Sequence, residues 1–281
     1  MPELPEVEVT RRGLLPHLPD RRVVRVRWGD KPLRFPIPGE LLEREISGQR
    51  IETIDRRAKY LLLRMSNKAV LVIHLGMTGR LGLFPAASPR ERHDHLRLLL
   101  DNDLELRLND SRRFGSVEVW PGKHAREMED DFSSSRGLEP LERGFTGEAL
   151  AHLATGRRQP VKNFLMDSRR VAGIGNIYAN EILFAARIHP ATPVNLLDPE
   201  QWEQIAGATP EILRAAIRAG GSTISDFLGS SGKPGYFQLQ LSVYDRAGDP
   251  CPHCRSPIEK TALGGRATWF CPSCQGMKPQ G

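Results

Sequence analysis

Four cysteines near the C-terminal end of this 281-residue chain constrain its fold more than any other feature. They form two C-x-x-C pairs, separated by residues 255–270: Cys251, Cys254, Cys271 and Cys274. This spacing is typical of a structural zinc site in a reducing compartment, with two disulfides or a redox dithiol as the alternatives. Neither a secretion signal nor a thioredoxin-like βαβ pattern supports those alternatives. We therefore predict one structural Zn²⁺ in a β-ribbon, with Gly264 and Gly265 at its hairpin turn.

Three cations lie within this predicted ribbon. Four thiolates and one Zn²⁺ carry a net charge of minus two, so a ribbon surface that faces a polyanion needs positive side chains nearby. Arg255, Lys260 and Arg266 supply them. Arg266 follows the glycine turn and is the best placed to reach a ligand; a solvated hairpin arginine is the alternative.

Alternating apolar and polar residues recur through the first 120 residues. Four segments alternate with period two and three are more continuously apolar, which together predict about seven strands. The segments are VVRVRW, QRIETID, DLELRLND, SVEVW, AKYLLLRM, AVLVIHL and HLRLLL. A helix is expected before them, because Pro5 suits a first helical turn and nearby glutamates suit its positive end. Residues 1–120 therefore predict a helix followed by an all-β sandwich or barrel.

The composition changes after residue 120. Residues 121–136 are polar, charged and rich in serine, which predicts a linker. Residues 137–225 carry apolar side chains at helical spacing and predict an all-α domain, in which Pro210 either starts a new helix after Thr209 or kinks a long one. Residues 226–244 are expected to form a connecting loop, and residues 245–281 the zinc module.

The overall composition indicates a globular protein with a polyanionic partner. Forty Lys and Arg against 34 Asp and Glu give a net charge of +6. Nucleic acid fits this excess; a solvated basic surface is the alternative. Every apolar run is far shorter than the ~18 to 20 residues of a membrane span, and the N-terminal segment lacks the pattern of a secretion signal. We expect no membrane association and a cytoplasmic location.

Several motifs occur together in a recognisable order. They are MPELPEVE, RRAKYLLL, HLGMTGRL, SRRFG, GIGNIYANEILF, GKPGYF and the four-cysteine ribbon. In these the chain resembles the bacterial formamidopyrimidine-DNA glycosylases, the MutM branch of the Fpg/Nei family. The resemblance implies a multi-domain α+β fold: an N-terminal helix plus β-sandwich, an all-α helix-two-turn-helix domain and a C-terminal four-cysteine zinc β-ribbon. It also implies a monomer that binds double-stranded DNA containing oxidised bases or abasic sites.

The resemblance assigns the chemistry mainly to the N-terminal residues. Pro2, exposed when Met1 is removed, matches the amine nucleophile, and Glu3 the general acid. An α-amino group suits this role, because about 14% of it is uncharged at pH 7 against roughly 0.04% of lysine. Glu6 and Glu181 match carboxylates that orient the nucleophile or its water. A helix N-terminal charge and a satisfied helix carboxylate are the alternatives for these two.

Five residues match family contacts to DNA. The resemblance places Lys59 and His74 at phosphates beside the damaged nucleotide, Lys59 among the catalytic set. Asn176 lies in a Gly-bracketed turn before a helix, where a phosphate can bind. Lys162 matches a lysine that reaches the lesion, with an ordinary helix-surface lysine as the alternative. Arg266 completes the set, which would stabilise bent DNA.

Three further residues match the set that fills the duplex after a base is extruded: Met77, Arg112 and Phe114. Met77 and Phe114 would by type alone be core residues, whereas an arginine can bond the acceptors of cytosine, which favours a guanine lesion opposite cytosine. The segment Ser222 to Phe237 matches the loop that closes over the extruded purine, with Ser222 and Thr223 as polar contacts.

These assignments predict a bifunctional DNA glycosylase and abasic-site lyase of base excision repair. Its substrates would be oxidised purines, chiefly 8-oxoguanine and formamidopyrimidines, with strand cleavage by β,δ-elimination. A Nei-type enzyme for oxidised pyrimidines is one alternative, against which PELPEVE and the Met77, Arg112 and Phe114 set argue. A zinc-ribbon protein that binds damaged DNA without catalysis is the other.

Overall fold

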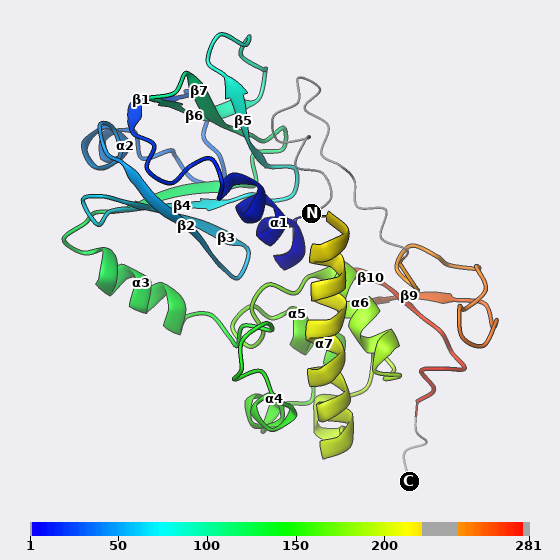
Figure 1. Ribbon diagram of the computed structural model, residues 1–281. Helices are drawn as coiled ribbons and strands as arrows, with labels where there is room; N and C mark the ends of the chain where they lie inside the picture. The colour runs from blue at the N-terminus through cyan, green and yellow to red at the C-terminus, as the bar shows by residue number, and fades with distance from the viewer. Residues whose placement is uncertain (1, 221–240, 278–281) are drawn as a thin grey trace. The chain divides into compact units, whose positions relative to one another are not determined.

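The computed structural model describes residues 2–220 and 241–277 (Figure 1). The chain divides into two compact units after Ser134: Met1–Ser134 forms most of one, and Ser135–Ala216 with the zinc ribbon most of the other. Residues 226–240 of the predicted connecting loop lie outside the described residues, as does the whole segment from Ser222 to Phe237 that was predicted to close over the purine.

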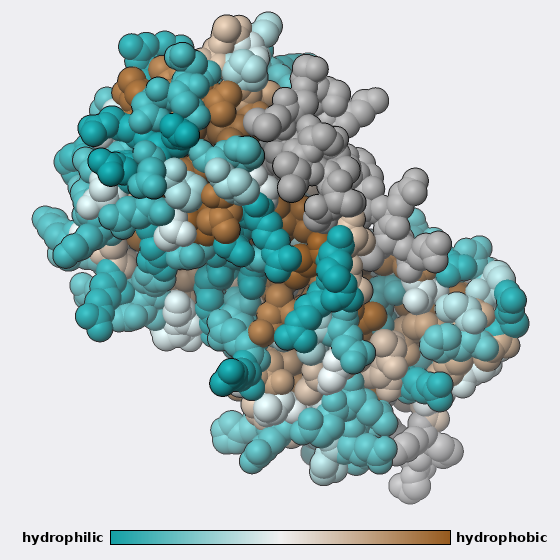
Figure 2. All heavy atoms as spheres, in the orientation of Figure 1, coloured by the Kyte–Doolittle hydropathy of each residue, from teal (hydrophilic) through white to brown (hydrophobic). Residues whose placement is uncertain are grey.

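Eight antiparallel strands form two four-stranded sheets in the first unit. One sheet has the order β1 (Val23–Trp28), β6 (Asp94–Leu100), β7 (Leu104–Asn109) and β5 (Arg80–Pro85). The other has the order β2 (Ile51–Arg57), β3 (Tyr60–Met65), β4 (Val70–His74) and β8 (Ser116–Trp120). Side chains of both sheets share one buried core, so the predicted sandwich is confirmed. In the view of Figure 2 the surface of this unit is mainly hydrophilic, with separate hydrophobic patches.

Each of the seven predicted segments contains a strand, and within residues 1–120 two elements were not predicted, β5 and α2. Strand β5 includes Gly82 and Pro85, residues that are rare inside strands, and helix α2 (Gly39–Glu45) is only seven residues long. Helix α1 (Leu4–Leu14) lies where it was expected and buries Val7 and Leu14 in the sandwich core. It packs beside β2 and β3, and therefore beside the hairpin that joins them (Figure 1).

The segment predicted to be a linker contains helix α3 (Ala125–Ser134). It covers the outer face of the β2-β3-β4-β8 sheet, where Trp120 belongs to a second small apolar cluster. The ring of Phe132 lies 4.9 Å from that of Tyr60 and 5.2 Å from that of Trp120. Because α3 covers this face, β3 and β4 are apolar on both sides, which explains their continuous hydrophobic runs.

The second unit combines helices with the ribbon. Its helices are α4 (Gly147–Ala154), α5 (Val161–Met166), α6 (Asn176–Ala185) and α7 (Pro199–Gly220), with a 3₁₀ turn, η1 (Val194–Leu196). Helix α7 is continuous through Pro210. Thr209 therefore lies inside the helix, where its hydroxyl donates to the carbonyl of Ile205 at 2.7 Å. Of the two alternatives for Pro210, the start of a new helix is excluded and a single long helix is found.

The ribbon consists of β9 (Glu259–Leu263) and β10 (Arg266–Phe270), joined by Gly264 and Gly265 at positive φ as the turn requires. The ribbon packs against helix α6. Phe184 of α6 shares one apolar cluster with Val243, Cys251, Ile258, Trp269 and Cys271. No helix among residues 2–220 and 241–277 is long and apolar enough to cross a membrane.

Candidate functional site

The first turn of α1 fixes the residues beside the predicted nucleophile. Glu3 is the N-cap residue and is 1% exposed, while Pro2 is partly exposed. Glu6 accepts the backbone N–H of Glu3 at 2.8 Å and completes a capping box with it. Pro5 occupies the start of the helix, where no amide hydrogen is needed. The cap therefore holds Pro2 and Glu3 at the end of a rigid element, and Glu6 orients Glu3 through the backbone.

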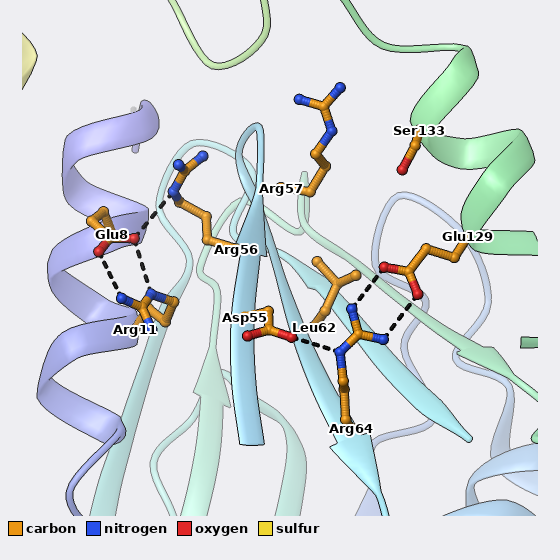
Figure 3. A pocket seen from close by; sticks show the side chains of 9 residues that line it. All are labelled: Glu8, Arg11, Asp55, Arg56, Arg57, Leu62, Arg64, Glu129 and Ser133. Carbon is orange, nitrogen blue, oxygen red and sulfur yellow. Dashed lines mark hydrogen bonds and ion pairs between the residues drawn. The ribbon is translucent and has the colours of Figure 1, made fainter. Parts of the chain in front are cut away.

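One turn further along α1, Glu8 accepts hydrogen bonds from three arginines, two of which, Arg11 and Arg56, are drawn in Figure 3. The distances are 2.9 Å to Arg11, 2.8 Å to Arg12 and 3.2 Å to Arg56. Burial alone raises the pKa of a carboxyl, but the hydrogen bonds from Arg11 and Arg12 outweigh it and lower the pKa of Glu8 to about 2. Glu8 is therefore an anion that joins α1 to strand β2.

Arg56 extends this connection to Lys59. Its Nη1 donates to the carbonyl of Ala58 at 2.9 Å, within the turn between β2 and β3 that also contains Lys59. Ala58 has φ of 53°, a backbone conformation that costs energy for a residue with a side chain. Glu8 and Arg56 thus tie the helix that begins beside Pro2 to the turn that presents Lys59. Sequence reasoning missed both residues, although Glu8 has helical spacing to Arg11 and Arg12.

Glu8, Arg11 and Arg56 line an open pocket of about 380 Å³ on the first unit. Arg64 lies on the opposite wall from Glu8 in Figure 3 and donates to both carboxylate oxygens of Glu129 on α3, at 2.9 and 2.7 Å. This pair lowers the pKa of Glu129. The pocket walls are therefore largely neutralised, and Arg64 instead attaches α3 to the sheet.

His74 ends β4 opposite the first residue of β3. It pairs with Tyr60 in the sheet register, and their rings are 4.7 Å apart. Lys59 precedes Tyr60, so Lys59 and His74 lie at the same end of this sheet. His74 Nδ1 accepts the backbone N–H of Gly76 at 3.1 Å. A neutral His74 therefore carries its ring proton on Nε2, a donor suited to a phosphate oxygen.

The three residues predicted to fill the duplex lie on two loops at the same end of the sandwich. Met77 is 37% and Phe114 45% exposed, so neither is a core residue. Arg112 is exposed, and its guanidinium carbon lies 4.8 Å from the centre of the Phe114 ring. The arrangement brings two apolar side chains and a hydrogen-bond donor together at the surface.

Lys162 does not lie at the surface. Its side chain is completely buried, and Nζ donates to the carbonyl of Ala267 at 2.9 Å and to Thr268 Oγ1 at 2.6 Å. Asn176, the first residue of α6, donates to the same carbonyl at 3.1 Å. Both residues hold β10 against the helices, so this placement does not support the predicted direct contact of Lys162 with DNA. Arg266, the residue before Ala267, is exposed.

Glu181 also has a structural environment. It is 5% exposed, and its carboxylate accepts the backbone N–H groups of Ser242, Val243 and Tyr244 at 2.8 to 2.9 Å. These bonds satisfy a buried carboxylate and fix the chain that leads into the ribbon. The structure therefore favours the satisfied helix carboxylate over the predicted catalytic role.

The four cysteine sulfurs lie within 4.8 Å of one another. The pairs Cys251–Cys274 and Cys254–Cys271 are 3.8 and 3.4 Å apart, too far for disulfides, whose S–S bond is about 2.05 Å. Tetrahedral zinc with Zn–S bonds of ~2.3 Å needs sulfurs ~3.8 Å apart. Backbone N–H groups of His253 and Cys274 also point to thiolate sulfurs, at 3.4 Å each. The donor set fits one zinc ion.

A β-sandwich with an N-terminal proline helix, a helical domain and a four-cysteine ribbon together define a class of DNA-repair glycosylases. Three family models match this chain in the same order. They are the Formamidopyrimidine-DNA glycosylase N-terminal domain at residues 1–117, its H2TH domain at 136–228, and the zinc finger found in FPG and IleRS at 248–276. The chain belongs to the formamidopyrimidine-DNA glycosylase family.

Relatives and solved structures agree over the full length. The formamidopyrimidine-DNA glycosylases of Geotalea uraniireducens and Methylococcus capsulatus are 48% and 46% identical, each over 98% of this chain and 100% of the relative. The Lactococcus lactis Fpg (MutM), solved in complex with DNA containing an oxidised pyrimidine, is 33% identical with a TM-score of 0.87. The match covers 98% of this chain and 100% of the Lactococcus lactis chain. Another structure of the Lactococcus lactis protein contains abasic-site DNA.

Proposed function

We propose that this chain is a bifunctional DNA glycosylase and abasic-site lyase that excises oxidised purines from duplex DNA. The support comes from full-length similarity to formamidopyrimidine-DNA glycosylases and from solved complexes of the Lactococcus lactis relative, one of which contains a Fapy-dG lesion. Its preferred substrates are 8-oxoguanine and formamidopyrimidines opposite cytosine. It acts on DNA in the bacterial cytoplasm, as a monomer.

The reaction begins at the amine of Pro2 after Met1 has been removed. The nitrogen lone pair attacks the deoxyribose anomeric carbon, the bond from that carbon to the base breaks, and the departing base takes up the proton that the Pro2 nitrogen loses. Glu3 protonates the ring oxygen, so the sugar opens and an iminium forms at Pro2. The iminium acidifies the neighbouring C–H, and loss of that proton expels the 3′ phosphate. A second elimination releases the 5′ phosphate, so the strand is cut on both sides of the lesion.

The observation that carries this proposal is the attachment of Lys59 to the helix of the nucleophile. Glu8 binds Arg56, and Arg56 binds the carbonyl beside Lys59. A rigid link of this kind holds a phosphate contact at a fixed distance from Pro2, which is how positioning accelerates a reaction between bound groups. His74 lies at the same end of the sheet and adds a donor for the phosphate backbone.

The second unit contributes DNA contacts and the metal. Asn176 opens α6 and Arg266 stands beside the ribbon tip, and both bind phosphates. The four cysteines hold one structural zinc ion, which stabilises the ribbon that carries Arg266. Met77, Arg112 and Phe114 fill the space left by the extruded base, and Arg112 reads the opposite cytosine.

Borohydride trapping tests the central step. Reduction of the iminium should link the wild-type protein covalently to duplex DNA containing 8-oxoguanine opposite cytosine. Pro2→Gly, or protein that retains Met1, should lose most trapping while keeping its affinity for the duplex. Pro5→Ala is the matched control, because it removes a proline from the first turn of α1, three residues from Pro2, without touching the amine. Normal trapping by protein shown by mass spectrometry to retain Met1 would exclude Pro2 as the nucleophile.

The choice of lesion tests the substrate class. The Lactococcus lactis relative binds DNA with an oxidised pyrimidine, so excision assays should compare 8-oxoguanine, a formamidopyrimidine and an oxidised pyrimidine in one sequence context. Faster excision of both purine lesions supports the proposal. Preference for the pyrimidine would instead place the chain with the Nei-type activity.

A further inference from the structure

The loops that present Met77, Arg112 and Phe114 are joined backbone to backbone. Gly76 has φ of +63°, and a Cβ atom there would lie 2.4 Å from the backbone nitrogen of Gly115 and the carbonyl carbon of Phe114. A Cβ atom on Gly115 would lie 2.7 Å from the carbonyl oxygen of His74. Only glycines allow this approach, so the loop 75–79 and the loop 110–115 are in direct contact beneath the exposed side chains.

One buried carboxylate binds both loops. Asp110 has no exposed surface, and its Oδ1 accepts the hydroxyl of Thr78 at 2.5 Å. The same oxygen faces the backbone N–H of Arg112 at 3.3 Å, while Oδ2 accepts the backbone N–H of Gly115 at 2.8 Å. The Thr78 oxygen in turn accepts the N–H of Arg112 at 3.1 Å. Both carboxylate oxygens therefore accept hydrogen bonds. Oδ1 binds before Phe114 in the chain, at Arg112, and Oδ2 binds after it, at Gly115.

The strand behind the loops fixes Asp110 itself. Its backbone carbonyl lies 2.9 Å from Nε2 of His95, a buried residue of β6. Arg113, between Arg112 and Phe114, has φ of 57°. The hydrogen bonds of Asp110 to the N–H groups of Arg112 and Gly115 maintain this unfavourable conformation. Hydrogen bonds to an ionised acceptor are stronger and shorter than those between neutral groups. The carboxylate can therefore hold a turn whose own backbone preference opposes it.

We propose that Asp110 and Thr78 are positioning residues that set the opposite-base specificity of this protein. They form a clamp that fixes the backbone of Arg112 while its guanidinium stays exposed above Phe114. Asp110 is completely buried and does not touch DNA; it acts through the loops that it joins. This inference rests on the proposed function, because it gives Arg112 a base to read.

Two substitutions separate the clamp from general stability. Asp110→Asn keeps the side-chain shape but has one acceptor oxygen in place of two. Either the N–H of Gly115 or the hydroxyl of Thr78 and the N–H of Arg112 therefore lose the oxygen to which they donate. Thr78→Val removes the hydroxyl at nearly constant volume, whereas Thr78→Ser retains it and should restore the wild-type behaviour. Val26→Ala is the control, because Val26 is buried on β1 at the opposite edge of the sheet from β5.

The readout is the ratio of kcat/KM for 8-oxoguanine opposite cytosine to that opposite adenine. We expect Asp110→Asn and Thr78→Val to lower this ratio about tenfold, in the range of a hydrogen bond to a charged group. Arg112→Ala should lower it at least as much. Val26→Ala and Thr78→Ser should leave the ratio unchanged. An unchanged ratio in Asp110→Asn and Thr78→Val, with activity lost equally on both duplexes, would overturn the proposal.

Hydrogen exchange in the free protein tests the clamp independently of catalysis. The amides of Arg112 and Gly115 should exchange faster in Asp110→Asn and Thr78→Val than in the wild type, with Val26→Ala as the comparison. If wild-type protein fails to trap lesion DNA, the proposed function fails, but exchange still decides whether Asp110 holds the loops. Unchanged exchange at both amides would exclude the clamp even in an active enzyme.

Discussion

Glu8 shows how one side chain can join a helix to a sheet through charge. It is 6% exposed and accepts hydrogen bonds from Arg11 and Arg12 on its own helix and from Arg56 on β2. A buried carboxylate without such partners would be costly, and one with three arginines is stable as an anion. Its low pKa makes its contribution to stability depend on pH.

Glu8→Gln should therefore change the pH dependence of unfolding. The pKa of Glu8 falls from 4.5 to about 2 on folding, so its ionisation stabilises the fold fully above about pH 4.5 and this contribution is lost as pH falls toward 2. At about 1.4 kcal/mol for each pKa unit, the contribution at neutral pH is about 3 kcal/mol. Urea unfolding between pH 2 and 7 measures the free energy of unfolding, which should fall less steeply with decreasing pH in the variant than in the wild type. Glu52→Gln, on an exposed residue, should show the same dependence of unfolding free energy on pH as the wild type. If Glu8→Gln also shows the wild-type dependence, the ionised Glu8 does not contribute to stability as proposed.

Lys162 and Glu181 mark the limit of residue-scale reasoning from sequence. Their types and motifs favoured a DNA contact and a catalytic carboxylate, but both side chains are buried and bound to the backbone of the second unit. Their partners are 105 and 62 residues away along the chain. No local pattern reports such partners, because a charged residue on a helix has the same sequence signature whether it faces solvent or a buried carbonyl.

At the scale of elements, the strands were predictable where burial follows period two and the helices where apolar spacing is regular. Helix α3 was missed because it buries little of its own surface, chiefly Ala125 and part of Phe132, and its other residues are polar. On β7 the alternation was detected, but Glu105 and Arg107 on its polar side are buried. Arg107 donates to the carbonyls of Ser88 and Pro89, so a returning loop covers that face.

The zinc ribbon gives a prediction at this scale. Cys271 binds the metal and also lies in the apolar cluster with Phe184 of α6, so loss of zinc should loosen α6 as well as the ribbon. Cys271→Ser, or chelation of the wild type, should lower the zinc content below one per chain. Trp269 fluorescence should report the unfolding of the ribbon. Ser273→Ala removes an exposed hydroxyl of the same knuckle, and this variant should keep both the zinc ion and the folded ribbon. A ribbon that stays folded without metal would contradict a structural role for zinc.

At the scale of the whole molecule, the candidate DNA contacts come from both compact units. Lys59, His74 and the Arg112 loop belong to the first, and Asn176 and Arg266 to the second. The motif order in the sequence predicts this division of roles, which stays a prediction. The buried contacts that support the first unit's set were not predictable, because Glu8 meets Arg56 and Thr78 meets Asp110 across 48 and 32 residues of the chain. With a net charge of +6, the chain should bind duplex DNA with a marked dependence on salt.

Arg266→Ala tests whether the second unit contributes a phosphate contact to that binding. Arg266 is exposed and belongs to neither the metal site nor the ribbon core, so the variant should keep one zinc ion per chain and a nearly unchanged melting temperature. If Arg266 neutralises one phosphate, the slope of log affinity against log salt becomes shallower by about 0.9. Titrations at four salt concentrations on two unrelated duplexes measure this slope. Arg187→Ala, on another exposed arginine of the same unit, should leave it unchanged. A constant slope with a loss confined to one duplex would show that Arg266 reads bases, and an unchanged affinity would leave it a solvated residue of the hairpin.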